Sequence, residues 1–387
     1  MARIHPVYAG MATTIFEAMS ALCRELGAIN LGQGFPDDHG PAELIEAAAR
    51  ALREKSNQYP PGSGLPELRN AIRAFYRRWQ GLELASEQVI VTSGATEAIA
   101  DAVLALVCPG DEVILFQPAY DAYAPMVRRA GGVPVSVALH PPHWRYRAAD
   151  IAAAITAKTR VLMLNDPLNP AGTAASEAEL AMIAETCVAH DLIAISDEVW
   201  EHVRFTGPPH RSLMTFPGMA GRTIKIGSAG KIFGLTGWKT GWLIAAPELA
   251  AGLARAHQFM TYTTPPALQW AVADGLALPD TWFAARDAAW SASRERLRAG
   301  LERASFAVLP NAATWFLCVD LAASGIALGD REFSEKALRE AGVASIPVSA
   351  LFEGDTPTHI VRFCFTKPDA MLDAAVERLG VFRRSLI

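Results

Sequence analysis

The sequence predicts an α/β fold: a large domain with a mostly parallel central sheet flanked by helices, followed by a smaller α+β domain. Three observations lead to this prediction. The chain has 387 residues, 51% of them hydrophobic, which is enough for two domains with a sizeable core. Short apolar runs alternate with helical patterns over about residues 86–246. Beyond about residue 280, helices and strands follow one another in a mixed order.

Six short apolar runs predict the strands of the large domain. In chain order they read QVIVTSG, DEVILF, TRVLMLNDP, DLIAISDEV, TIKIGS and GWLIAA. Most are continuous rather than alternating and are bounded by Gly, Pro or Asp, as is typical of strands buried on both faces of a parallel sheet. Between them, EAIADAVLALV and SEAELAMIAETCVAH carry apolar residues at three- and four-residue steps. This spacing predicts helices that cover the sheet.

A smaller domain is predicted for residues 281–387. Its pattern begins with a long charged helix, FAARDAAWSASRERLRAGLERA, and continues through strand-like ATWFLCVDL and helix-like REFSEKALREAG. VASIPVSA, IVRFCF and a closing helix complete it. We expect residues 1–45 to join this small domain and to contribute to the functional site. Residues 46–280 then form the large domain.

Composition argues against several classes of function. The formal net charge of −5 shows no basic excess, which argues against nucleic acid or an anionic membrane as a partner. The five cysteines are scattered and form no CxxC pair, which favours free thiols in a reducing compartment. The first residues contain no apolar core of signal-peptide length, and no apolar run reaches the length of a membrane span. We therefore expect a cytoplasmic protein with no membrane partner.

The stretch GSAGKIFGLTGWKTGW, residues 227–242, places Lys231 among small and apolar residues. Desolvation disfavours the ammonium form and lowers the pKa of such a lysine. One interpretation is a surface lysine in a glycine-rich loop. The other is an amine kept partly neutral so that it can attack a carbonyl carbon. The motifs elsewhere in the chain are needed to choose between them.

Polar residues follow several predicted strands, at the edge where an open parallel sheet binds ligands. In VIVTSGATEA, the N–H groups of Ala95 and Thr96 open a helix and would hold a phosphate, although other strand-to-helix turns look similar. In NDPLNPAGT, two prolines and a glycine either direct Asn169 or form an ordinary capped turn. In AISDEVW, Asp197 could cap a helix, bind a metal or pair with a buried cation. No set of residues with metal-ligand spacing accompanies it, so we expect no metal.

Taken together, these features describe one site with a phosphate cradle, a carboxylate facing a cation, and a lysine able to form an imine. Pyridoxal phosphate requires all three features. Its aldehyde takes the lysine, its ring nitrogen stays protonated opposite a carboxylate, and its phosphate anchors it. The sequence therefore predicts a pyridoxal-phosphate enzyme.

The motifs resemble those of the class I aminotransferases of fold type I, over essentially the whole chain. SAGKIFGLTGWKTGW resembles the lysine signature of that family, which implies Lys231 as the Schiff-base residue and Ser228 and Lys239 as phosphate ligands. NDPLNPAGT resembles a second family motif, which implies that Asn169 lies near the phenolic oxygen of the cofactor and the substrate carboxylate. SDEVW resembles a third, which implies Asp197 as the partner of the pyridinium nitrogen.

The resemblance implies roles for four more residues. Tyr120 in QPAYDAY would stack on the cofactor ring, and Arg362 in IVRFCF would clamp the substrate α-carboxylate, a bidentate task suited to guanidinium. Tyr59 in NQYPPGSGLPELR would reach the phosphate of the neighbouring subunit, which implies a homodimer with shared active sites. Trp200 stands where the family usually has a tyrosine hydrogen-bonded to the phenolic oxygen, and an indole N–H can donate but not accept.

INLGQGFPD and TTIFEAMS resemble the methionine and kynurenine aminotransferase branch of the family. This implies that Gly34 lies beside the substrate carboxylate, and that Ile15 and Tyr262 lie near the substrate side chain. The implied reaction is transamination between a 2-oxo acid and an L-amino acid of the methionine, aromatic, kynurenine or glutamine type. Two alternatives remain: a pyridoxal-phosphate β-lyase acting on sulfur amino acids or cysteine S-conjugates, and an aminotransferase-like ligand-sensing module.

Overall fold

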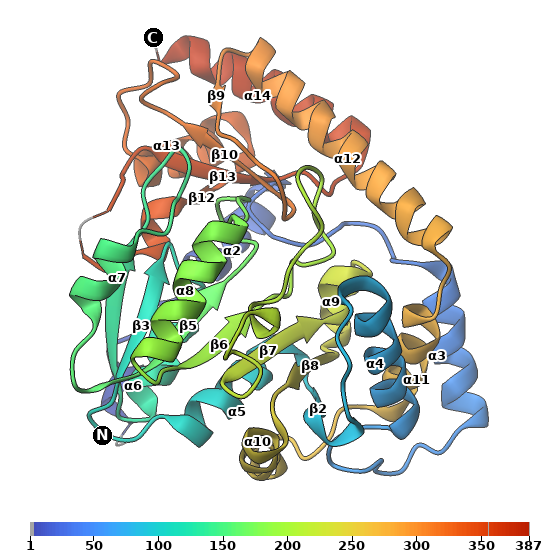
Figure 1. Ribbon diagram of the computed structural model, residues 1–387. Helices are drawn as coiled ribbons and strands as arrows, with labels where there is room; N and C mark the ends of the chain where they lie inside the picture. The colour runs from blue at the N-terminus through green and yellow to red at the C-terminus, as the bar shows by residue number, and fades with distance from the viewer. Residues whose placement is uncertain (1–3, 355, 387) are drawn as a thin grey trace.

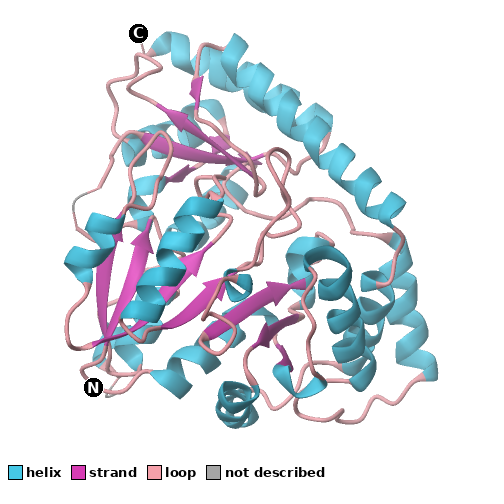
Figure 2. Ribbon diagram, viewed as in Figure 1, coloured by secondary structure: helices cyan, strands magenta, loops and turns pink. Residues whose placement is uncertain are grey.

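The computed structural model describes residues 4–354 and 356–386. A large sheet flanked by helices lies beside a smaller sheet, which is the α/β architecture predicted from the sequence (Figure 1, Figure 2). The helices that surround the large sheet are α3 (Ala42–Glu54), α4 (Pro66–Gln80), α5 (Gly94–Leu106), α6 (Tyr123–Arg129), α7 (Ala148–Ala154), α8 (Glu177–Ala189), α9 (Ala229–Ile232), α10 (Pro247–Met260) and α11 (Pro266–Leu276).

The large sheet has seven strands in the order β2–β8–β7–β6–β5–β3–β4. Strands β7, β6, β5, β3 and β4 are parallel, whereas β8 runs antiparallel to both of its neighbours. The strands are β2 (Val89–Thr92), β3 (Glu112–Gln117), β4 (Val133–Ala138), β5 (Thr159–Asn165), β6 (Ile193–Asp197), β7 (Thr223–Ser228) and β8 (Gly241–Ile244). All six predicted runs are therefore strands.

Strand β4 is the one that the sequence analysis missed. Its side chains are mostly half-buried or exposed, so it lacks the continuous apolar run of the six predicted strands, which include β2 at the opposite edge of the sheet. Pro134 removes a backbone donor and lowers the strand signal further. An edge position tolerates both features because one side of the strand needs no hydrogen-bond partner.

The smaller sheet is antiparallel, with the strand order β12–β13–β10–β9. Its strands are β9 (Ala307–Val308), β10 (Phe316–Asp320), β12 (Ile346–Pro347) and β13 (Ile360–Cys364). The helices of this part of the chain are α12 (Asp280–Arg303), α13 (Asp330–Lys336) and α14 (Asp369–Ser385). Helix α12 runs from the side of the large sheet to the small one, where it lies alongside α14 (Figure 1).

The N-terminal segment contributes α1 (Pro6–Ala9), α2 (Ile15–Leu26) and β1 (Ile29–Asn30). Strand β1 pairs in parallel with β11 (Val343–Ala344), and the backbone N–H of Cys364 donates to the carbonyl of Leu31 at 2.7 Å. The beginning of the chain thus packs against residues more than 300 positions later. The domain bounds at residues 45 and 280 stay a prediction. Among the described residues, no helix combines the length and apolar character needed to cross a membrane.

The start of α5 lies in direct contact with β8. A Cβ added to Gly241 would come within 2.7 Å of the carbonyl carbon of Gly94 and 2.8 Å of the nitrogen of Ala95. These atoms belong to the backbone, which cannot move aside as the end of a flexible side chain can. Glycine at position 241 is therefore what allows the first turn of α5 to rest on β8.

We predict that Gly241→Ala lowers the free energy of unfolding by about 1–3 kcal/mol, because the added methyl group overpacks this contact. Urea denaturation measures the effect. Gly237→Ala is the matched control, since no atom lies within 4 Å of the Cβ position there, and it should change stability by less than about 0.5 kcal/mol. Equal stability of the two variants would contradict the proposed role of Gly241.

Candidate active site

A cavity of about 480 Å³ lies at the carboxyl ends of the large-sheet strands, where β10 and β13 of the small sheet face it. It brings together most of the residues singled out in the sequence. Those that line it are Gly34, Ala95, Thr96, Tyr120, Asn169, Asp197, Trp200, Ser228, Lys231, Lys239 and Arg362. Their positions support the interpretation of these motifs as one site, and their individual roles stay predictions.

Lys231 lies in α9, immediately after β7, and its side chain faces the cavity. Its Nζ is 4.9 Å from the ring centre of Trp200 and 5.3 Å from that of Trp315. Burial among these groups lowers the pKa of the amine to about 8, and the opposing charge of Asp197 limits the shift. At that pKa about a tenth of the amines are neutral at pH 7. The site can therefore supply an uncharged amine, which the surface-loop interpretation would not.

Asp197 ends β6 and is only 6% exposed. The hydroxyl of Tyr123 donates to its Oδ2, and the N–H of Val199 donates to its Oδ1 at 3.4 Å. Burial raises the pKa of the Asp197 carboxyl, while these two donors and the charge of Lys231 lower it. A cationic group in the cavity would favour the ionised form further. The carboxylate is thus placed to stabilise a positive charge inside the cavity.

Tyr123 is a site residue that the sequence analysis missed. It opens α6 three positions after Tyr120, and the two rings meet edge to face with their centres 5.6 Å apart. Burial raises the pKa of the Tyr123 hydroxyl well above its usual value, and the charge of Asp197 acts in the same direction, so it stays a donor. The motif QPAYDAY contains both tyrosines, so the signal was present without a means of separating their tasks.

Arg362 lies in β13 and is only 1% exposed. Its Nη1 donates to Oδ1 of Asn169 at 3.0 Å, and its Nη2 donates to the carbonyl of Gly32 at 2.6 Å. The guanidinium carbon is 3.9 Å from the ring centre of Phe316. Among the described residues Arg362 has no ion pair, and its buried Nε has no hydrogen-bond partner. Burial lowers the pKa of the guanidinium to about 10.

Asn169 and Gly34 complete the surroundings of this guanidinium. The backbone N–H of Asn169 donates to Oδ1 of Asn165 at 2.9 Å, and Nδ2 of Asn165 donates to the carbonyl of Asp197 at 3.0 Å. The turn after β5 is thereby fixed to the end of β6. A Cβ on Gly34 would lie 2.6 Å from the ring of Phe316, so glycine is what allows this ring to lie beside the cavity.

The first turn of α5 carries the donors expected of an anion cradle. Gly94 has a φ of 77°, and the helix begins here with Ala95 and Thr96 facing the cavity. A Cβ on Gly94 would lie 3.1 Å from the Nζ of Lys239, so the ammonium group rests directly against the helix start. Ser228, at the end of β7, also lines this part of the cavity. Helix N–H groups, an ammonium and a hydroxyl form a donor set suited to a phosphate.

Trp200 follows β6 and is 2% exposed. Its ring meets Trp315 nearly perpendicularly at 5.0 Å and Phe316 at 5.3 Å between ring centres. Together these rings form an apolar wall beside Lys231. The rings of Trp200 and Trp315 thus contribute to the burial of the Lys231 amine, and burial lowers its pKa.

Ile15, Tyr59 and Tyr262 do not line the cavity of this single chain. Ile15 packs against the cluster formed by α2 and the small sheet, while Thr14 and Phe16 on either side of it line the cavity instead. Tyr59 is 83% exposed, and its ring contacts that of Tyr262 with centres 5.7 Å apart. The predicted roles of Ile15 and Tyr262 near the substrate side chain therefore gain no support within one chain.

The sequence model for "Aminotransferase class I and II" matches residues 27–379. The chain belongs to this family. It is therefore an aminotransferase of fold type I that uses pyridoxal phosphate, as the resemblance of its motifs implied. The family assignment agrees with the lysine, carboxylate and anion cradle found in the cavity.

Named relatives of this aminotransferase differ in their substrates. The chain is 46% identical to the probable N-succinyldiaminopimelate aminotransferase of Mycobacterium tuberculosis, covering 96% of each chain. It is 39% identical to the methionine aminotransferase of Escherichia coli, over 95% of this chain and 96% of the relative. The solved structure of the first protein has a TM-score of 0.94 over 98% of this chain and 100% of its own. The solved structure of a single mutant of the Thermus thermophilus aspartate aminotransferase, 29% identical, has a TM-score of 0.90 over 98% of this chain and 100% of its own.

We predict that Lys231→Ala lowers turnover by several orders of magnitude, as expected for loss of a covalent and proton-transferring group. Formation of 2-oxo acid measures it, and Lys158→Ala, at an exposed lysine, is the control. In the cofactor-free protein, labelling of the Lys231 amine should reach half its maximal rate at a pH of about 8. Substantial transamination by Lys231→Ala, or a labelling midpoint near 10.5, would contradict this assignment.

Proposed function

We propose that this aminotransferase transfers the amino group of an L-amino acid with an uncharged side chain to a 2-oxo acid. The observation that supports it most directly is Arg362, a buried guanidinium without an ion pair among the described residues. A buried cation without a counter-ion is costly unless a ligand supplies the opposite charge. The α-carboxylate is the group that every amino acid and every 2-oxo acid brings to the site.

The residues of the cavity fit pyridoxal phosphate. Lys231 would bind its aldehyde carbon, and Asp197 would face its ring nitrogen. Tyr120 would contact the face of the ring. The first turn of α5, with Lys239 and Ser228, would hold the phosphate. Bound in this way, the cofactor supplies an electron-withdrawing ring that stabilises negative charge at the substrate Cα.

The side chains of the protein then have separate tasks. Arg362 and Asn169 orient the substrate through its α-carboxylate. The neutral Nζ of Lys231 would take the proton from the substrate Cα and would deliver it to the carbon of the cofactor that had carried the aldehyde oxygen. Asp197 would stabilise a positive charge on the ring nitrogen, and its carboxylate accepts hydrogen bonds from the hydroxyl of Tyr123 and from the N–H of Val199. Trp200 limits the access of water to the amine.

The lining of the cavity favours uncharged substrate side chains. Its cationic side chains, among the described residues, are Lys231, Lys239 and Arg362, and each already has a proposed task. The other lining side chains near Arg362 include Phe16, Gln33 and Phe316, which are apolar or neutral. A second carboxylate would find no free cation here and would lie near Asp121, so it would be buried at a cost.

This proposal agrees with the name of one relative and differs from that of another. Methionine aminotransferase acts, by its name, on a donor with an uncharged side chain. The relative of 46% identity is named for N-succinyldiaminopimelate, which carries further carboxylates. N-succinyldiaminopimelate is the second candidate substrate, which the sequence identity favours and the lining of the cavity does not. A β-lyase reaction on cysteine S-conjugates would use the same lysine and carboxylate.

We predict that methionine, phenylalanine, kynurenine and glutamine react at least about tenfold faster than aspartate, measured as kcat/KM for formation of the 2-oxo acid, because a buried unpaired carboxylate is unfavourable.

Arg362→Lys should lower kcat/KM for all donors alike by about tenfold to a hundredfold, since lysine loses the two-pronged contact with the shared α-carboxylate. Arg339→Lys, at an exposed arginine, is the control.

Other outcomes have definite meanings. Highest activity with N-succinyldiaminopimelate would replace the proposed donor with the second candidate. Release of a thiol and pyruvate from a cysteine S-conjugate, faster than transamination, would identify a β-lyase. A loss in Arg362→Lys confined to one donor would place Arg362 beside the substrate side chain instead of the α-carboxylate.

We also propose a homodimer with shared active sites. Tyr59 and Phe259 are each 83% exposed, and Met260 and Tyr262 nearby in the sequence are 50% and 41% exposed. Large apolar side chains gathered on one surface are typical of an interface. Tyr59 does not line the cavity of its own chain, so we assign it a contact with the cofactor phosphate in the cavity of a second copy.

We predict that mixing Lys231→Ala with Tyr59→Ala under subunit exchange, at limiting cofactor, restores activity well above that of either variant. In a mixed dimer, one site combines an intact Lys231 from one chain with an intact Tyr59 from the other. If Tyr59 instead serves its own subunit, no arrangement makes a complete site and the mixture shows only the average of the parents. That average, with exchange confirmed by mass spectrometry of tagged chains, would refute sharing.

A further inference from the structure

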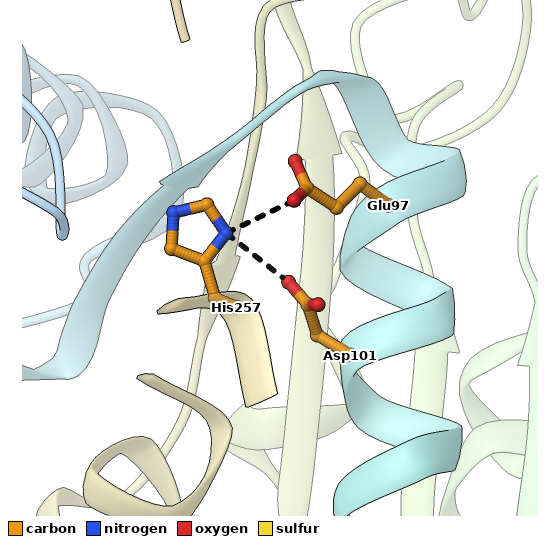
Figure 3. A group of neighbouring side chains, drawn as sticks. All are labelled: Glu97, Asp101 and His257. Atoms are coloured by element: carbon orange, nitrogen blue, oxygen red, sulfur yellow. Dashed lines mark hydrogen bonds and ion pairs between the residues drawn. The ribbon is translucent and has the colours of Figure 1, made fainter. Parts of the chain in front are cut away.

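Three buried titratable side chains meet beside the first turns of α5, outside the residues that line the cavity. Glu97 and Asp101 project from α5, and His257 projects from α10 toward them (Figure 3). The exposed fractions of Glu97, Asp101 and His257 are 8%, 0% and 1%. The Nδ1 of His257 lies 3.1 Å from Oε1 of Glu97 and 3.4 Å from Oδ2 of Asp101. The proposed function leaves all three unused.

The hydrogen bonds define the protonation of His257. Its Nε2 lies 2.9 Å from the carbonyl oxygen of Gly62, which can only accept, so Nε2 carries a proton. Its Nδ1 faces two carboxyl groups and must also carry a proton if these are ionised. A ring with both nitrogens protonated is an imidazolium cation. The geometry therefore calls for a charged histidine in a buried position.

The charges of the cluster agree with this protonation. Burial alone would lower the pKa of His257, but Asp101 and Glu97 raise it to about 10. Burial would raise the pKa of Glu97, but hydrogen bonds from His257, from Thr261 and from the N–H of Ser93 lower it. Burial raises the pKa of Asp101, and the contact with His257 at 3.4 Å lowers it in part. Glu97 and Asp101 on α5 and the Gly62 carbonyl are the groups that face the imidazole.

The cluster joins three segments that meet at the start of α5. Glu97 accepts a hydrogen bond from the hydroxyl of Thr261 at 2.5 Å. It accepts another from the N–H of Ser93, the residue that precedes the helix. Ser93 is followed by the Gly94 turn of the anion cradle. Gly62, which accepts from His257, lies three residues after Tyr59. The imidazolium thus connects the cradle of its own chain with the exposed loop that carries Tyr59.

We propose that His257 is a positioning residue for cofactor binding: its charged ring fixes Glu97, and through it the first turn of α5, in the orientation that binds the phosphate. The inference rests on the proposed placement of the phosphate at α5. It assigns to His257 no contact with the cofactor. Its effect is transmitted by the contact with Glu97 and the bond from the N–H of Ser93 to that carboxylate.

Two substitutions separate the halves of this contact. His257→Gln can keep a donor near the Gly62 carbonyl but places none at the position of Nδ1. His257→Asn can keep a donor near Glu97 but does not reach Gly62. Both remove the charge. Circular dichroism and urea denaturation establish that each variant is folded before cofactor is added.

Affinity for pyridoxal phosphate and for pyridoxal, which lacks the phosphate, tests the inference without measuring turnover. We predict that His257→Gln weakens binding of pyridoxal phosphate about tenfold, the loss expected for a charged hydrogen bond, and leaves binding of pyridoxal unchanged. His257→Asn should lose less, because it still donates to Glu97. An equal loss for both compounds, or no loss for either, would overturn the inference, because a merely structural histidine does not discriminate between them.

Two controls accompany this measurement. His190→Gln changes an exposed histidine at the C-terminal end of α8 and should leave both affinities unchanged. Lys239→Ala tests the phosphate site itself and should weaken binding of pyridoxal phosphate selectively. If Lys239→Ala has no selective effect, the placement of the phosphate is wrong. If it has and His257→Gln has none, only the role of His257 is wrong.

The protonation state has a readout of its own. Nitrogen NMR of histidine-labelled protein should show His257 doubly protonated at pH 8, and Asp101→Asn should lower the pH at which it loses a proton. The stability that this cation contributes is complete below the unfolded pKa of 6.5 and is lost as the pH rises through about 10. A singly protonated ring at pH 7 would overturn the inference. So would a His257 signal moved by stoichiometric Zn²⁺, which would identify a metal site instead.

Discussion

An excess of positive charge inside one cavity is the constraint on which this site depends. Lys231, Lys239 and Arg362 all line it, and within residues 4–354 and 356–386 none of them forms an ion pair with a carboxylate of the protein. Asp121 and Asp197 balance only part of this charge. Arg362 is buried, and a buried cation is stable when a ligand brings the missing negative charge. A phosphate and an α-carboxylate are anions that a pyridoxal-phosphate aminotransferase binds together, so the imbalance is a form of preorganisation.

Two lysines near each other in the sequence, Lys225 and Lys231, show that burial alone does not lower the pKa of an amine. Lys225 in β7 is fully buried, and its Nζ contacts Glu198 and, at 2.6 Å, Glu201. Burial would lower the pKa of Lys225, but the two glutamates raise it, so it stays charged. Lys231, six positions later, has aromatic rings beside it and a pKa lowered to about 8. The pKa of each lysine thus depends on how many carboxylates contact its Nζ: two for Lys225 and, among the described residues, none within ion-pair distance for Lys231.

Two kinds of contact hold this arrangement together: close packing at glycines, and hydrogen bonds between residues that are far apart in the sequence. Gly241 lets α5 rest on β8, and Gly34 makes room for Phe316 beside Arg362. The guanidinium in turn joins the N-terminal segment to the turn after β5, through Gly32 and Asn169. A substrate bound at Arg362 would therefore contact a group that is joined to both sheets. The cluster around His257 links the start of α5 to the loop that contains Gly62.

The sequence by itself determined six of the seven strands of the large sheet, because each carries a continuous apolar run, and it placed Asp197, Asn169 and Lys231 at or just after the ends of three of them. It did not predict β4, whose half-exposed side chains leave no continuous apolar run, or separate the task of Tyr123 from that of Tyr120. Only the tertiary structure brought His257 to Glu97, 160 positions away, because such contacts depend on how helices pack and leave no local pattern. For the same reason only the structure showed that Tyr59 lies on the outer surface and does not line the cavity of its own chain.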